Sequence, residues 1–285
     1  MHSDERTMTV LLLDPDTRLV KALTARLGCD AVVLGPSGVA KAIALAGAGR
    51  LDAVLGEALH LSDLAAFASM GVPCGLWTSN DVDDLIGPAR AAGISLIATK
   101  TQPLLLDEIL MALGNWMDGL GTGVERYLGG DGIRLGAMVV EKPGGVADAC
   151  RAVLASLSGP LGDSRRLRLV LDELMTNTLH HGGGAAATVE WGSDGVKHVF
   201  IVRDPAGRLS PDEILGLLDR RLRGEGLLDP RGRGLHLSRI YADRLYVSVV
   251  PGLSTESAAV FWNHPGAYQG HKPVWVQKIK RTRGE

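Results

Sequence analysis

The sequence predicts an α/β protein in which residues 8–118 form a doubly wound, five-stranded parallel sheet. Aliphatic runs of strand length recur at even spacing, at residues 10–13, 31–34, 53–55, 72–77 and 94–98. Segments with helical periodicity separate them, such as residues 18–27, where Leu19, Leu23 and Leu27 share one face. Because parallel strands are buried on both faces, this alternation favours a sheet covered by helices on both sides.

Polar side chains follow these strands at the points where the strands end. Asp14 and Asp16 follow the first strand, Glu57 the third, Thr78 the fourth and Lys100 the fifth. Ligands of such sheets bind at the carboxyl ends of the strands, so these side chains form a candidate site. The alternative is that they are ordinary polar groups at loop ends, without a ligand.

The set of residues resembles the receiver domain of response regulators over residues 8–118. The resemblance implies that Asp14 and Asp16 hold Mg²⁺ and that Thr78 and Lys100 contact phosphoryl oxygens. Glu57 stands where that family has its phosphoryl-accepting aspartate, and its side chain is one methylene longer. We therefore expect a degenerate receiver, or pseudo-receiver, in which the Glu57 carboxylate lies near the place of a phosphate.

A glycine-rich stretch at residues 119–136 predicts a linker, with a short turn at 125–128. Strand and helix character then resumes at residues 137–141 and 146–157. Residues 263–285 are expected to form a basic tail, which contains Lys272 and Trp275. No internal repeat is evident.

An amphipathic helix is expected at residues 164–181, with Leu167, Val170, Leu171 and Leu174 on its buried face. Glu173 and Asn177 lie one turn apart on another face. An amide oxygen can bind Mg²⁺ and a carboxylate can accept a proton, so the pair suits a magnesium–nucleotide site. On spacing alone, a solvated surface pair is the commoner explanation.

Three later segments strengthen the nucleotide interpretation. Asp204 ends an expected strand at 198–203, with Gly207 three residues on, and a carboxylate there can accept hydrogen bonds from an aminopurine. Gly232 and Gly234 precede an expected helix at 235–241, where free N–H groups attract phosphate. Thr255 lies in a turn between the expected strands 245–250 and 257–262.

In this order, the segments resemble the ATPase domain shared by histidine kinases, Hsp90 and anti-sigma-factor serine kinases, over residues 137–262. The resemblance implies a two-layer α/β sandwich that binds ATP and Mg²⁺. Glu173 would be the catalytic base, Asn177 the Mg²⁺ ligand, and Asp204 and Thr255 the adenine contacts. Gly207 belongs to the adenine-binding motif, which is reduced here to Asp-Pro-Ala-Gly, and Gly232 and Gly234 would lie beneath the phosphates.

Composition narrows the classes of function. The chain has 285 residues, 46% hydrophobic and 22% charged, which fits two soluble domains. A net charge of −2 gives no electrostatic argument for nucleic acid, and no apolar run approaches the length needed to span a membrane. The three cysteines are widely spaced, as is typical of reduced thiols in a cytoplasmic protein.

Other nucleotide motifs are absent. The chain has no Gly-x4-Gly-Lys-Ser/Thr loop, and the glycine pair before the last helix is not a dinucleotide fingerprint. A helical hairpin with a phosphoacceptor histidine is missing between the two domains, which argues against a self-contained histidine kinase. His180 and His181 are expected in the wall of the nucleotide site.

The sequence thus predicts a cytoplasmic bacterial signalling protein in which a receiver-like module regulates an ATP- and Mg²⁺-binding output domain. The output would phosphorylate Ser or Thr of a regulatory partner protein. An alternative is a non-catalytic nucleotide-sensing scaffold that controls partner binding, and a weaker one is that neither domain binds its ancestral ligand. Whether the chain forms a homodimer is left open.

Overall fold

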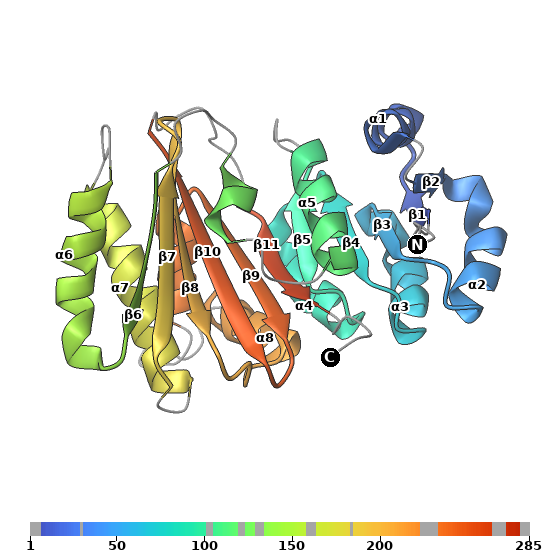
Figure 1. Ribbon diagram of the computed structural model, residues 1–285. Coiled ribbons are helices and arrows are strands. Elements are labelled where there is room, and N and C mark those ends of the chain that lie inside the picture. Colours follow the sequence, from blue (N-terminus) through green and yellow to red (C-terminus); the bar gives the residue numbers. More distant parts are fainter. Residues whose placement is uncertain are drawn as a thin grey trace, which may run out of the picture. The chain divides into compact units, whose positions relative to one another are not determined.

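The computed structural model describes residues 7–28, 31–100, 105–118, 123–128, 134–157, 164–182, 185–222, 233–263 and 272–279 (Figure 1). The chain divides into two compact units, Met1–Asp118 and Gly119–Glu285. Each unit is α/β and is described separately below.

The sheet of the first unit is entirely parallel, with strand order β2-β1-β3-β4-β5. Its strands are β1 (Met8–Leu13), β2 (Ala31–Leu34), β3 (Ala53–Gly56), β4 (Cys74–Thr78) and β5 (Leu96–Thr99). Its helices are α1 (Thr17–Leu27), α2 (Val39–Gly47), α3 (Leu61–Ser69), α4 (Val82–Ala91) and α5 (Leu105–Asp118), with short 3₁₀ turns η2 (Pro36–Gly38) and η3 (Ala58–His60). The five expected parallel strands are confirmed at nearly their predicted limits.

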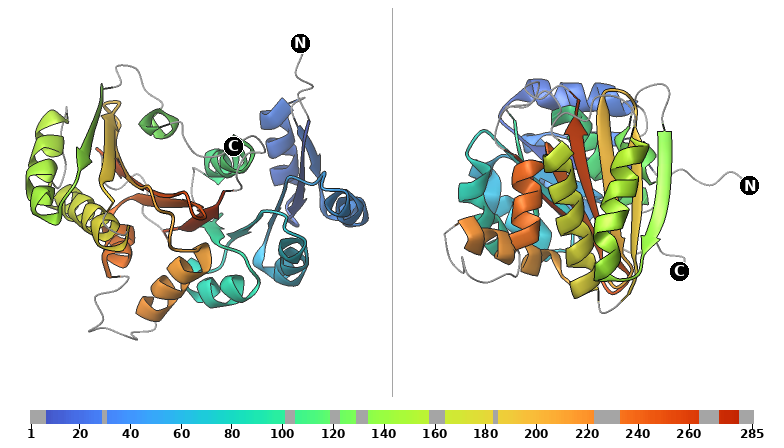
Figure 2. Two further views of the ribbon diagram at one scale, coloured as in Figure 1. Left: turned by 60° about the horizontal axis from the view of Figure 1, so that its bottom comes forward. Right: turned by 90° about the vertical axis from the view of Figure 1, so that its left-hand side faces the viewer.

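Helices lie on both sides of this sheet (Figure 2). Arg26 of α1 and Asp107 of α5 approach to 3.8 Å, which places these two helices on the same face. Strands β3, β4 and β5 are buried along their whole length, and Val10 to Leu13 of β1 are fully buried, whereas Val32 of the edge strand β2 is 43% exposed. This double burial explains why continuous aliphatic runs marked the strands.

The second unit has a mainly antiparallel sheet, with strand order β11-β9-β10-β8-β7-β6; among its described strands, the β11–β9 pair alone is parallel. Its strands are β6 (Arg134–Val140), β7 (Ala187–Ser193), β8 (Lys197–Asp204), β9 (Arg244–Val250), β10 (Ser254–Trp262) and β11 (Val274–Lys278). Its helices are α6 (Val146–Ser156), α7 (Ser164–His181), α8 (Pro211–Leu222) and α9 (Arg233–Tyr241), with 3₁₀ turns η4 (Val124–Tyr127) and η5 (Pro143–Gly145).

Several predicted limits in this unit need correction. Strand β6 begins inside the expected linker 119–136, and β11 lies inside the expected tail 263–285. Val274, Trp275 and Val276 are each at most 2% exposed, because this apolar run pairs with β9 instead of extending into solvent. Thr255 lies within β10 and not in the turn before it.

Helices α6, α7 and α9 pack on one face of the second sheet, and η4 lies on the other (Figure 2). Arg166 of α7 stacks over the Phe261 ring at 5.3 Å, which identifies the helix-covered face of β10. Thr255 lies an even number of residues from Phe261 and is paired with Asp204, so both point to this face. The sheet thereby brings Asp204 and Thr255 to the same side as α7.

Candidate functional site

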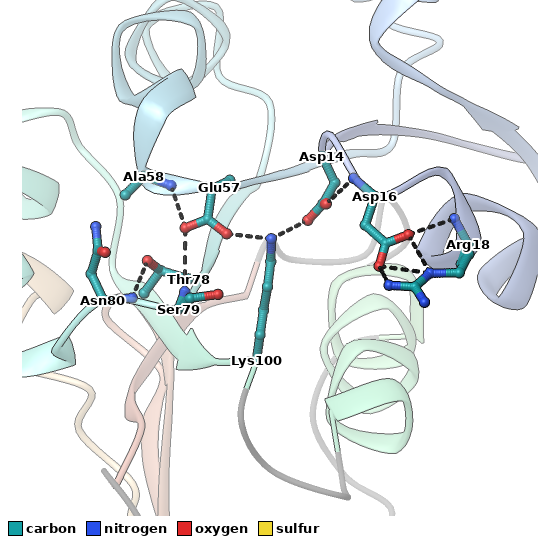
Figure 3. Close-up of polar contacts among 9 residues, drawn as sticks. All are labelled: Asp14, Asp16, Arg18, Glu57, Ala58, Thr78, Ser79, Asn80 and Lys100. Atoms are coloured by element: carbon teal, nitrogen blue, oxygen red, sulfur yellow. Dashed lines mark hydrogen bonds and ion pairs between the residues drawn. The ribbon is translucent and has the colours of Figure 1, made fainter.

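In the first unit, two of the predicted acidic residues, Asp14 and Glu57, meet at Lys100 (Figure 3). The Lys100 ammonium pairs with Asp14 Oδ2 at 2.5 Å and also with Glu57 Oε2. Asp14 is 1% and Glu57 9% exposed, so both ion pairs are shielded from water. The structure thus brings together the residues that close β1, β3 and β5.

Glu57 is held by further donors. Its Oε1 accepts hydrogen bonds from the N–H groups of Ala58 at 3.1 Å and Ser79 at 3.3 Å. Burial by itself would raise the pKa of Glu57, but hydrogen bonds from Lys100 and Thr78 outweigh it and the pKa is lowered. The Glu57 carboxylate therefore stays ionised at neutral pH and occupies the donors at the ends of β3 and β4.

The pKa of Lys100 is shifted in the opposite direction to that of Glu57. Burial would lower its pKa, whereas hydrogen bonds to Asp14 and Glu57 raise it, and the pKa ends above its ordinary value. Thr78 is completely buried, and its Oγ1 also accepts a hydrogen bond from the Asn80 N–H at 3.0 Å. The result is a compact cluster of internal ion pairs.

Asp16 is differently placed. Its Oδ1 accepts hydrogen bonds from the Arg18 N–H at 2.9 Å and Nε at 3.0 Å, so it caps α1. The side-chain bond from Arg18 is the main reason that the pKa of Asp16 falls to about 2. Within the described ranges, no three His, Cys, Asp or Glu side chains are grouped to hold a metal ion. Magnesium binding by Asp14 and Asp16 stays a prediction.

In the second unit, two of the expected nucleotide residues, Glu173 and Asn177, lie on α7. Gly234, in the first turn of α9, lies against both Glu173 and Asn177. A Cβ atom at Gly234 would come within 2.6 Å of Glu173 Oε2 and still closer to Asn177 Nδ2. The positive end of α9 is thereby placed at the Glu173–Asn177 pair. Gly232 lies outside the described residues.

The electrostatic surroundings of Glu173 shift its pKa. Its pKa is raised, first by burial and then by neighbouring Asp172, while Arg233 at the start of α9 acts against the shift. A raised carboxylate pKa favours general-base chemistry near neutral pH.

Asp204 and Thr255 form the other end of the candidate site. Asp204 Oδ1 accepts a hydrogen bond from the Ala206 N–H at 2.8 Å. Gly182, which directly follows α7, lies so close that a Cβ there would be 2.9 Å from the same Asp204 oxygen. Thr255 Oγ1 is buried and has no hydrogen-bond partner among the residues that the structure describes. The sequence prediction missed Gly182, although its place just after the predicted helix is a usable signal.

Gly207 has a structural role that its motif did not reveal. Its φ of +54° favours glycine, and a Cβ there would lie 2.6 Å from Ser254 N and Val250 O. Its carbonyl accepts a hydrogen bond from Gly252 N–H at 3.1 Å, which fixes the loop after β8 against the β9–β10 turn.

His180 and His181 are exposed at the end of α7, and the expectation that they line the site stays untested. No described helix combines the length and apolar character needed to cross a bilayer.

The chain was compared with protein-family models, curated proteins and solved structures. No protein-family model matches the chain, and no curated protein matches it. Among solved structures, a LuxR family DNA-binding response regulator from Silicibacter pomeroyi is similar, with 19% sequence identity and a TM-score of 0.31. The similarity covers 37% of this chain and 90% of that one.

Proposed function

We propose that the second unit binds Mg²⁺–ATP along α7, and that the chain is a signalling protein in which the receiver-like unit regulates this nucleotide site. The observation that carries the proposal is the approach of Gly234 to Glu173 and Asn177. A glycine without space for a Cβ brings helix N–H groups and the two side chains to one point, as phosphate binding requires.

Thr255 supports the fit at the adenine end. A buried hydroxyl without a partner costs free energy, and an adenine or a water bound to it would remove that cost. Asp204, paired with Thr255 across the β8–β10 ladder, supplies the acceptor for an exocyclic amine.

The residues of the site are suited to transfer of a phosphoryl group from ATP to a hydroxyl group. Mg²⁺–ATP would supply the phosphoryl group, with the Asn177 amide oxygen as a ligand of the metal ion. Glu173, whose pKa is raised, would accept the proton of a Ser or Thr hydroxyl from a regulatory partner protein.

A non-catalytic switch is the second candidate. It is favoured by the first unit, where Glu57, at the position that resembles the phosphoryl acceptor of receiver domains, forms an internal ion pair with Lys100. Such a unit could regulate a partner without turnover, while ATP binding changes which conformation is populated.

Calorimetry with ATP and Mg²⁺ separates these functions. Asn177→Ala should abolish tight binding, whereas Glu173→Gln should retain binding and lose turnover. Arg168→Ala changes an exposed residue of the same helix and is the matched control. Binding without hydrolysis or transfer would assign the switch, and a wild-type chain that does not bind ATP would refute both functions.

A further inference from the structure

The C-terminal end of α9 is held by a lysine from outside the expected ATPase region 137–262. Lys272 Nζ donates hydrogen bonds to the carbonyl of Ala242, at 2.6 Å, and to that of Ile240. The last carbonyl groups of a helix have no hydrogen-bond donors within the helix, and its C-terminal end carries a partial negative charge. A lysine ammonium group can donate hydrogen bonds to these carbonyls and is attracted by that charge.

Arg239 completes the attachment in the reverse direction. From within α9 its Nη2 donates to the Lys272 carbonyl at 2.7 Å and its Nε to the Pro273 carbonyl at 3.3 Å. Arg239 is only 8% exposed, so these bonds form away from bulk water. We call this reciprocal set, Lys272 and Arg239, the α9 clasp.

The segment that carries Lys272 is itself firmly placed. It leads into β11, whose residues pair with β9, and Ile279 N–H donates to the Val249 carbonyl at 2.8 Å. Lys272 and Pro273 therefore directly precede a strand that is fixed in the sheet of the second unit.

The other wall of the nucleotide site is anchored to the same turn. Arg166 of α7 binds Asp243 through two hydrogen bonds of 3.1 and 3.0 Å, and Asp243 Oδ2 also accepts from the Trp262 N–H at 2.8 Å. The two residues that follow α9 therefore make all of these contacts: Ala242 binds Lys272 of the clasp, and Asp243 binds α7 and β10.

The helix between these anchors is short, since α9 has nine residues. Isolated helices of this length are marginal in water, so tertiary contacts determine where its first turn lies. Gly234, which meets Glu173 and Asn177, is at one end of α9, and the clasp is at the other.

We propose that Lys272 and Arg239 are positioning residues, which hold α9 so that Gly234 stays against Glu173 and Asn177. The C-terminal segment 272–279 would thereby set the affinity of the site for the phosphate end of a nucleotide. For its ligand, this inference rests on the proposed function.

The test uses the full chain and the variant Lys272→Met, with Lys278→Met as a control in the same segment, because Lys278 is exposed at the end of β11. Hydrogen exchange of the α9 amides is measured without nucleotide, and the affinities for Mg²⁺–ATP and for adenosine are measured by calorimetry. We expect faster α9 exchange and roughly tenfold weaker ATP binding in Lys272→Met, equivalent to about 1.4 kcal/mol. Adenosine affinity should be unchanged, and Lys278→Met should match the wild type.

Unchanged α9 exchange in Lys272→Met would overturn the inference. Equal weakening of adenosine and ATP would also overturn it, because a general structural defect does not select the phosphate end. If the wild-type chain binds no ATP, the proposed function fails, and the exchange result alone decides whether the clasp holds α9.

A second variant guards against misfolding of the first. Arg239→Lys keeps the charge but cannot reproduce both carbonyl contacts, so its α9 exchange should lie between those of wild type and Lys272→Met. Exchange equal to that of the wild type would count against the clasp.

Discussion

Replacing Gly234 by alanine tests the candidate nucleotide site most directly. An added methyl group would come within 2.6 Å of Glu173 Oε2 and closer still to Asn177 Nδ2. Both atoms are the far ends of flexible side chains, so the protein can accommodate the methyl group by moving them. The substitution should therefore displace the two functional groups while leaving the backbone in place.

The expected change in stability is small. Alanine favours a helix over glycine by about 1 kcal/mol, and overpacking costs about 1–3 kcal/mol, with the lower end expected where side chains can move. The two effects nearly cancel, so the free energy of unfolding in urea should change by about 1 kcal/mol or less.

The expected change in binding is larger. Losing a hydrogen bond or ligand contact to a charged group costs about 1.5–3 kcal/mol, which corresponds to roughly 10- to 100-fold weaker ATP binding by calorimetry. Gly47→Ala, at the end of α2 where an added Cβ meets nothing within 4 Å, is the control and should leave ATP affinity unchanged. Wild-type ATP affinity in Gly234→Ala would refute the argument that this glycine shapes the site.

Three further predictions concern buried polar groups. The pKa of Glu57 is lowered in the folded state, so ionised Glu57 stabilises the fold at pH values above its ordinary pKa of 4.5. Urea unfolding should show Glu57→Gln destabilised at pH 7, and the difference from wild type should shrink as the pH falls below 4.5. A difference that does not change with pH would contradict the assignment. Burial lowers the pKa of Lys272 from 10.5 to about 8. Between pH 8 and 10.5, Lys272 is therefore more fully protonated in the unfolded chain than in the folded one, and the free energy of unfolding rises with pH. Lys272→Met should not show this rise, and a rise that persists in the variant would assign it to another group. The Tyr127 ring stacks on the Tyr246 ring with 5.6 Å between their centroids, and the Tyr127 hydroxyl hydrogen-bonds Glu256. Tyr127→Phe should keep the ring contact and lower the free energy of unfolding by about 1 kcal/mol. An unchanged free energy would show that the hydroxyl contributes nothing to stability.

The elements found from sequence were those with a strong, uniform pattern. Strands β1, β3 and β5 of the first unit are largely buried, and each contains a run of consecutive aliphatic residues. Helix α7 spans Ser164–His181, as predicted, and its apolar stripe is buried from Leu167 to Leu179.

The elements missed have patterns that depend on distant partners. Strand β7, which the sequence analysis did not identify, contains Glu190, whose charge is compensated by Arg203 of the neighbouring strand β8. Strand β11 lies among basic residues, and only its pairing with β9 explains its burial.

The sequence alone determined the residue types of both candidate sites, because motif order and strand ends are local properties of the chain. The tertiary structure decided how those residues are used. Lys100 joins Asp14 and Glu57 only because three strand ends meet at one edge of the sheet. Gly234 reaches Glu173 and Asn177 only because α9 packs on α7, and the attachment of α9 to Lys272 depends on a strand that pairs with β9. These approaches join residues far apart in the chain, and burial and packing determine such distances, not the spacing of residues along the sequence.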